Sequence, residues 1–205
     1  MSAADQRTVA QRPPQHRSRL RLCGARLAGA LACLLICAAL NGQKAKPTDY
    51  EVKAAYLYNF GKFVEWPENS ANGKEQFFEI CVLGRDPFGA ALDTTLVGQS
   101  IGGRKVVAKR IAKPEDAIAC QVLFISTSEQ EQLKSILAVL ARASVLTVSD
   151  MPEFSLHGGM IQFISYGDRV RFEVNLTNAG NAGLTLSSEL LKVAMTVRKN
   201  QSSGD

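Results

Sequence analysis

The chain has 205 residues, 24 of them basic and 19 acidic, which gives a formal net charge of +5. Six Arg and one Asp precede residue 43, so the remaining 163 residues hold 18 charges of each sign. A balanced charge there predicts no basic face of the kind that nucleic-acid binding requires, so we expect no nucleic-acid partner. The length of this part suits one domain with one substantial core.

Residues 1–42 have the pattern of an export signal. Arg residues precede an uncharged apolar run of 14 residues, from Leu27 to Leu40, which is shorter than the roughly 20 residues of a membrane-spanning helix. We predict a signal peptide at 1–42, cleaved after Gly42, and a periplasmic protein. The alternative is an uncleaved leader, and only that leader would contact the membrane. Cys33 and Cys37 match a lipid-attachment box poorly, so lipidation is not expected.

The cysteines divide between the leader and the domain. Three of the five lie before residue 43, and only Cys81 and Cys120 follow it. In an oxidising compartment such a pair is expected to form a disulfide, while two buried thiols at strand ends are the alternative. Metal sites need three or four ligands, and no further ligands are evident in the sequence, so no metal residues are predicted.

The first element predicted after the leader is a helix that begins at a capping box formed by Thr48 and Glu51 and ends at Trp66-Pro67. Its apolar residues recur at helical intervals, namely Val52, Ala55, Tyr56, Phe60 and Phe63, with Leu57 and Val64 widening the face. Ala54 and Tyr58 lie outside that face. The excess of apolar surface predicts either burial on two sides or a docking surface for another protein.

The middle of the chain alternates between strand and helix patterns. We predict strands at 78–83, 104–111, 121–126 and 144–149, and helices at 86–96 and 129–141. This alternation is typical of an α/β domain, and its crossover helices imply a buried central sheet with parallel parts. Residues 98–103 have the first spacing of a phosphate loop but lack its Lys-Ser/Thr, so we predict a turn there.

The last third of the domain predicts an antiparallel hairpin. Strands at 160–165 and 169–175 flank a Gly-containing loop and should close the sheet. Ser187 then caps a final helix whose inward residues are Leu190, Val193, Ala194 and Val197, and a flexible tail follows at 198–205. The predicted fold is therefore α/β: a single domain at 43–197 with a mixed central sheet flanked by helices and a C-terminal β-hairpin.

Polar side chains alternate with apolar ones in the second hairpin strand. Arg171, Glu173 and Asn175 should project from one face, where a guanidinium, a carboxylate and an amide could together recognise a ligand or partner. The alternative is a solvated ladder, in which a surface ion pair contributes only about 0 to 1 kcal/mol.

The sequence predicts no catalytic residues and no cofactor. His157 is the only histidine after the leader, and its Gly neighbours favour a loop position. No G-x-G-x-x-G motif is present, so a dinucleotide site is not indicated.

Three motifs resemble those of the YfiR family, in the expected order: YLYNFGKFVEWP at 56–67, GRDPFGAAL at 84–92 and GGMIQF…VRFEVNL at 158–176, followed by SSELLKVA at 187–194. This resemblance implies a non-enzymatic periplasmic α/β protein. Its expected partner is the periplasmic domain of an inner-membrane diguanylate cyclase, which it holds inactive, lowering cyclic-di-GMP and biofilm formation. The family typically has two disulfides; Cys81 and Cys120 match one, and residues 151–162 lack cysteines for the other.

The partner surface is predicted on the first helix, with Tyr58, Phe60 and Trp66 as anchors, and on the polar strand through Arg171, Glu173 and Asn175. Phe60 is at the same time expected in the core. A small-ligand binding or sensor domain is the alternative function, with its ligand at the carboxyl end of the sheet. The sequence leaves a homodimer open.

Overall fold

The computed structural model describes residues 46–68 and 76–199. The predicted signal peptide at 1–42 and the residues of the predicted tail from 200 onward lie outside these ranges, and the domain described below begins at Pro47. No helix within the two ranges is long and apolar enough to cross a membrane.

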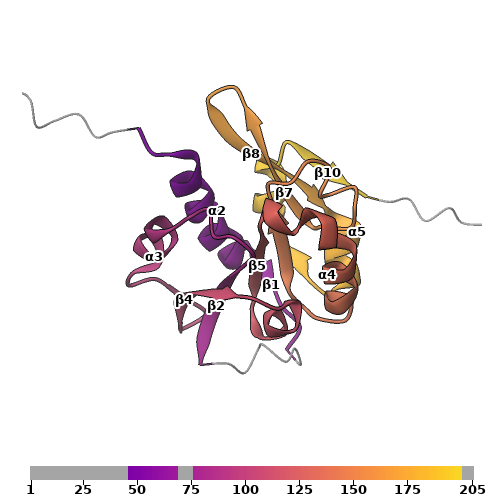
Figure 1. The fold of residues 1–205 in the computed structure, drawn as a ribbon, viewed down its shortest axis with the longest axis horizontal. Helices are drawn as coiled ribbons and strands as arrows, with labels where there is room; N and C mark the ends of the chain where they lie inside the picture. Colours follow the sequence, from indigo (N-terminus) through magenta and orange to yellow (C-terminus); the bar gives the residue numbers. More distant parts are fainter. Residues whose placement is uncertain (1–45, 69–75, 200–205) are drawn as a thin grey trace, which may run out of the picture. The chain divides into compact units, whose positions relative to one another are not determined.

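The described residues form an eight-stranded mixed sheet in the order β10-β8-β7-β6-β5-β2-β4-β3 (Figure 1). Its strands are β2 (Phe77–Leu83), β3 (Ser100–Ile101), β4 (Arg104–Ile111), β5 (Val122–Ile125), β6 (Leu146–Ser149), β7 (Ile161–Tyr166), β8 (Arg169–Asn175) and β10 (Thr196–Arg198). The neighbours from β4 to β7 pair in parallel, whereas β3 is antiparallel to β4 and β8 to β7. The predicted α/β domain with a mixed sheet is confirmed.

The strand order creates a switch point in the parallel part of the sheet. The first parallel strand, β2, lies between the second, β4, and the third, β5. The chain therefore leaves β2 on one side and returns on the other. In sheets of this kind, ligands bind outside the carboxyl ends of the strands near the switch point. The loops that follow β2, β5 and β6 consequently bound the region where a site is expected.

Helices cover both faces of the sheet. They are α2 (Asp49–Phe63), α3 (Ala90–Leu96), α4 (Leu133–Leu140), α5 (Leu176–Asn181) and α6 (Ser188–Val193), with 3-10 helices η2 (Pro114–Ala119) and η3 (Thr127–Gln132). The helix predicted from residue 86 begins later, because Asp86 Oδ1 accepts a hydrogen bond from the backbone N–H of Phe88 and holds a turn there. The helix predicted at 129–141 is divided between η3 and α4.

The capping box that begins α2 is present as predicted: Thr48 Oγ1 accepts from the Glu51 N–H, and Glu51 Oε2 accepts from the Thr48 N–H. The helix ends at Phe63 and continues into β1 (Val64–Glu65), which pairs with β9 (Thr185–Leu186). The predicted apolar face is confirmed at Leu57 and Phe60, which are fully buried. It is wrong at two positions: Ala54, placed outside the face, is fully buried, and Ala55, placed on it, is exposed. Apolar residues surround so much of α2 that only the sheet beneath it selects the inner face.

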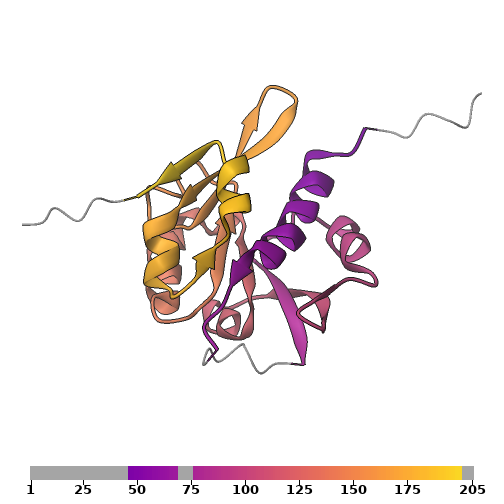
Figure 2. The same cartoon turned by 180° about the vertical axis from the view of Figure 1, so that it is seen from behind.

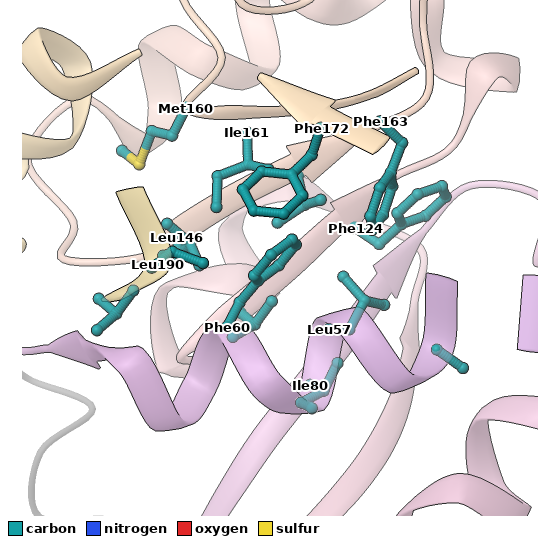
Figure 3. Packing of buried hydrophobic residues seen from close by; sticks show 14 of the residues in the cluster. Leu57, Phe60, Ile80, Phe124, Leu146, Met160, Ile161, Phe163, Phe172 and Leu190 are labelled. Carbon is teal, nitrogen blue, oxygen red and sulfur yellow. The ribbon is translucent and has the colours of Figure 1, made fainter. Parts of the chain in front are cut away.

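The core consists of two clusters, one on each face of the sheet. Phe60 of α2 lies among Phe163, Phe172 and other large side chains on one face (Figure 3). Leu123, Ile125 and Ile136 lie in the cluster on the other face. Because β5 and β6 are covered on both sides, all their residues are buried, as is typical of parallel strands.

The C-terminal third corrects two predictions. The β7–β8 hairpin forms, but it does not close the sheet, because β10 pairs in parallel with the outer side of β8. The final helix ends at Val193, which is 59% exposed rather than inward, and Val197 lies in β10. After Val193 the chain becomes extended, and the backbone groups of β10 form hydrogen bonds with the free edge of β8 instead of continuing the helix. Arg198, expected in the tail, is the last residue of β10.

Candidate functional site

The predicted anchors on α2 differ in their burial. Phe60 is fully buried and its ring lies 5.0 Å from that of Phe172, so the expectation of a core residue is confirmed. Tyr58 is half-buried, and Lys62 Nζ lies 5.5 Å from the centre of its ring. Trp66 is half-buried against Phe78, with ring centres 5.4 Å apart. Of the three, Tyr58 is the residue on the helix that could contact a partner without unfolding the core.

The predicted polar row on β8 is largely engaged inside the molecule. Asn175 is 5% exposed; its Oδ1 accepts from the Asn178 N–H and caps α5, and its Nδ2 donates to Ser155 O. Glu173 accepts hydrogen bonds from Arg198 and Ser155. The Arg171 side chain makes no hydrogen bond or ion pair with any residue that the structure describes, although its backbone belongs to the β7–β8 ladder. The three residues therefore do not form a solvated ladder. Of the three, Arg171 is the residue whose side-chain donors are available to a partner.

The helix anchors and the polar row face opposite sides of the sheet. Phe172 points toward α2, where it contacts Phe60, so its neighbours Arg171 and Glu173 point away from α2. Ser155, which binds Glu173, belongs to the loop that also supplies Phe154 to the other core cluster. The structure does not bring the two predicted patches together into one surface.

A patch that the sequence did not single out lies on the projecting part of the β7–β8 hairpin (Figures 1 and 2). Ile164 pairs with Arg171, and Tyr166 pairs with Arg169. These four residues share one face because each is two positions from the next along its strand. Tyr166 is 64% exposed and Arg169 is exposed. We call Ile164, Tyr166, Arg169 and Arg171 the hairpin surface.

A buried polar cluster joins the start of α2 to the carboxyl end of β6. Asp150 Oδ2 accepts from Lys53 Nζ at 2.7 Å and from the Tyr50 hydroxyl at 3.0 Å. The Lys53 and Asp150 side chains are only 9% and 12% exposed, and Lys53 Nζ lies 4.3 Å from the centre of the Tyr50 ring. Burial and the neighbouring Asp150 carboxylate raise the pKa of Tyr50 to about 12. Lys53, the one charged residue in the segment 52–58 of α2, was the sequence signal for this cluster.

A groove of about 540 Å³ opens beside this cluster, between α4 and the loop that follows β6. Leu133 and Met151 give it apolar walls, and Lys134, Glu153 and His157 give it charged or titratable ones. Glu153 has a left-handed backbone with φ of 58°, which is uncommon for a residue other than glycine. The predicted loop position of His157 is confirmed, and its Nε2 lies 3.9 Å from Glu153 Oε2.

Cys81 and Cys120 are joined, which confirms the predicted disulfide. Cys81 lies in β2 and Cys120 directly follows η2, with their Cα atoms 6.1 Å apart. Among the described residues, one group could hold a metal ion, and it consists of these two cysteines and Glu79.

The profile of the YfiR/HmsC-like proteins matches residues 50–195, from the start of α2 to the segment before β10. The chain belongs to the YfiR/HmsC-like family. This is a family of periplasmic regulators rather than of enzymes. Because residues 151–162 contain no cysteine, the YfiR/HmsC-like domain of this chain cannot form a second bridge in that segment.

Two solved structures are similar to the chain over part of its length. A conserved domain protein from Vibrio cholerae is 12% identical, with a TM-score of 0.50 over 75% of this chain and 62% of its own. The ABC domain from Streptococcus pneumoniae, solved in complex with L-Trp, is 10% identical, with a TM-score of 0.47 over 71% of this chain and 60% of its own. The chain spans about three fifths of each. The first shows the fold alone. No curated protein is significantly similar to the chain.

Proposed function

We propose that this protein binds the periplasmic domain of an inner-membrane diguanylate cyclase and represses it, thereby lowering cyclic-di-GMP signalling and biofilm formation. Its membership of a family of periplasmic regulators is the observation that carries the proposal. The disulfide supports a periplasmic location, because such bonds persist where the environment is oxidising. The chain itself is proposed to have no turnover, so its effect requires the partner.

The hairpin surface is the best candidate for the partner contact. Tyr and Arg dominate interface hot spots because they combine large contact area with few lost rotamers or with forked hydrogen bonds. Tyr166 and Arg169 are exposed, and the Arg171 guanidinium has no hydrogen bond or ion pair within the described part of the chain. With two guanidinium groups on this face, the complementary partner surface is acidic.

Tyr58 defines a second, independent candidate contact on α2. It is half-buried and contacts Lys62, so truncating it removes less core packing than truncating Phe60 would. Since α2 and the hairpin surface lie on different sides of the sheet, a small partner domain contacts one of them and a wrapping partner contacts both.

Binding of the partner's periplasmic domain by single variants tests both contacts. Tyr166→Ala and Arg171→Ala should each weaken capture by about 1 to 2 kcal/mol, roughly 5- to 30-fold in Kd, if they are hot spots. Arg142→Ala and Val139→Ala, at exposed or partly exposed positions in and just after α4, are the matched controls and should bind like wild type. Thermal unfolding must be unchanged in every variant that is compared.

Tyr58→Ala, measured in the same assay, then decides how far the interface extends. Weakened capture by Tyr58→Ala together with Arg171→Ala indicates a partner that wraps around the sheet edge. If Tyr166→Ala, Arg171→Ala and Tyr58→Ala all bind like wild type, the partner uses neither surface and this placement is wrong.

Repression itself is tested in cells. Deleting the gene should raise cyclic-di-GMP when the cyclase is expressed, and restoring it should lower the level again. The purified chain should neither synthesise nor cleave cyclic-di-GMP. Unchanged cellular levels with both proteins present would overturn the regulatory proposal.

The groove beside α4 favours a second candidate function, a periplasmic sensor of a small ligand. It lies at the carboxyl end of the sheet, where ligands bind in folds of this kind, and one wall contains the unusual backbone of Glu153. Native mass spectrometry of the chain isolated from the periplasm distinguishes the two: a sensor retains a bound molecule, and Leu156→Trp, at a 58% exposed position in the lining of the groove, should release it.

A further inference from the structure

A carboxylate lies next to the disulfide, on the same face of β2. Glu79 and Cys81 are two residues apart in the strand, and Cys120 reaches them from the end of η2. The three potential ligand atoms lie within 4.8 Å of one another. Both cysteines are fully buried, whereas the Glu79 side chain is 18% exposed. The group is therefore enclosed by protein on the sulfur side and open to water on the carboxylate side.

Backbone bonds hold these residues together independently of the sulfur–sulfur bond. The Gln121 N–H donates to Glu79 O at 3.1 Å, and the Glu79 N–H donates to Gln121 Oε1 at 2.6 Å. The Cys120 N–H donates to Ala117 O at 2.9 Å, which fixes the end of η2. Because Cys120 directly precedes Gln121, its position beside β2 does not depend on the bridge.

We propose that reduction of this disulfide creates a site for Zn²⁺ or another borderline-soft divalent ion, with Cys81 Sγ, Cys120 Sγ and a Glu79 carboxylate oxygen as ligands. Zinc accepts this combination of ligands in tetrahedral geometry, with Zn–S distances of about 2.3 Å, which places two thiolates about 3.8 Å apart. The Cα separation of 6.1 Å allows this spacing by side-chain rotation alone. Water takes the fourth position on the exposed side.

The chemistry balances with a dithiol as the reductant. The dithiol gives two electrons and two protons to the Cys81–Cys120 bond, which becomes two thiols, and is itself oxidised to a disulfide. Zn²⁺ then displaces the two thiol protons to the buffer and undergoes no redox change. Two thiolates and a carboxylate leave the loaded site with one net negative charge. Lys109 Nζ, 3.2 Å from Glu79 Oε2, lies where it offsets that charge.

The metal and the disulfide are therefore alternative links between the same two segments. In the oxidised chain no thiolate exists and the site is closed to metal. In the reduced chain the ion connects β2 to the end of η2 and protects both thiols from oxidation, because a coordinated thiolate is not available for exchange.

Zinc uptake by the full chain tests the proposal, with Cys23, Cys33 and Cys37 replaced by Ser so that the leader contributes no thiol. The chain is reduced with a dithiol, freed of it without oxygen, and titrated with Zn²⁺ against a chromophoric chelator. We expect one ion per reduced chain, none per oxidised chain, and sulfur-to-cobalt charge-transfer absorption when Co²⁺ replaces zinc. Glu79→Gln should weaken binding at least about tenfold, and Glu115→Gln, at an exposed position on η2, should not.

Reoxidation provides the check that a variant is folded, because Glu79→Gln retains both cysteines and must re-form the bridge. Zn²⁺ should also slow that reoxidation in the wild-type sequence and slow it less in Glu79→Gln. Absence of uptake by the reduced chain, equal uptake by the oxidised chain, or equal affinity of Glu79→Gln would each overturn the three-ligand site.

Discussion

Lys53 is a charged residue on the buried face of α2, and its position depends on one partner. Asp150 accepts its hydrogen bond at 2.7 Å, and the aromatic rings of Tyr50 and Phe163 lie 4.3 and 6.0 Å from the ammonium nitrogen. A buried pair of this kind adds little net stability compared with apolar residues, but either charge without the other is costly. The pair therefore fixes how α2 sits on the carboxyl end of β6.

The losses caused by removing each member of this pair should not be additive. We expect Lys53→Met to lower the free energy of unfolding by about 3 to 5 kcal/mol, because the Asp150 carboxylate then stays buried without its cation. The double variant Lys53→Met/Asp150→Leu should lose clearly less than the sum of the two single losses. Urea unfolding of the wild type, the two single variants and the double variant measures this coupling. Lys134→Met, at an exposed position, is the control and should leave the unfolding free energy nearly unchanged. Additive losses would contradict the coupling.

Tyr50 should make stability depend on pH in the alkaline range. Its pKa is raised from 10.0 to about 12, so the folded chain holds the phenolic proton after the unfolded chain has released it. The contribution is fully present below pH 10 and is lost as the pH rises through 12. Tyr50→Phe should flatten the decline in unfolding free energy over this interval. If the unfolding free energy of Tyr50→Phe declines with the same slope as that of the wild type, other groups cause the decline.

At the scale of elements, α2 approaches the sheet closely enough that one position requires the absence of a side chain. Gly61 lies on the buried face of the helix, and a Cβ there would meet Ile101 Cδ1 and Phe78 Cζ, both at 2.8 Å. Phe78 is fully buried and cannot move aside freely. Close helix–sheet packing thus opposes the intrinsic preference of helices for alanine over glycine.

Gly61→Ala and Gly180→Ala separate these two effects. Overpacking should outweigh the helix propensity at position 61 and lower the unfolding free energy by about 1 kcal/mol net. Gly180 lies within α5, and no atom other than its chain neighbours and the backbone of its own helix lies within 4 Å of the point that an alanine Cβ would occupy. Gly180→Ala should therefore be neutral or raise stability by up to about 1 kcal/mol. Equal effects of both substitutions in thermal unfolding would show that α2 can shift to accommodate the methyl group.

In the molecule as a whole, the disulfide closes a long loop that contains one edge of the sheet. Cys81 and Cys120 are separated by 39 positions, and the segment between them contains β3, β4 and η2. Constraining a loop of this length in the unfolded chain contributes up to about 4 kcal/mol. The bridge therefore stabilises one edge of the sheet, from β2 outward.

Replacing both cysteines by Ser should lower the unfolding free energy by up to about 4 kcal/mol, whereas α4 and the β7–β8 hairpin keep their contacts. Chemical denaturation of the non-reduced protein and of the double variant measures the difference. Non-reducing mass spectrometry of periplasmic protein should detect the linked peptides. Freely alkylated thiols at both positions would contradict the bridge.

The local features of this protein can be predicted without knowledge of the fold. The capping box of α2, the limits of β4, the turn between β7 and β8 and the cysteine pair follow from residues near in sequence or from composition. Such features depend on hydrogen bonds and steric preferences within a few residues, or on the single pairing that two cysteines allow, so no knowledge of the fold is needed.

Contacts between distant segments set which faces the elements present and which distant residues meet. The inner face of α2 is selected by the sheet beneath it, which buries Ala54 and leaves Ala55 exposed. Lys53 and Asp150 are 97 positions apart, and β10 pairs with β8 only because the sheet leaves that edge free. The free energies that stabilise these arrangements come from contacts between segments distant in sequence. The residue pattern of one segment does not indicate which other segment will pack against it.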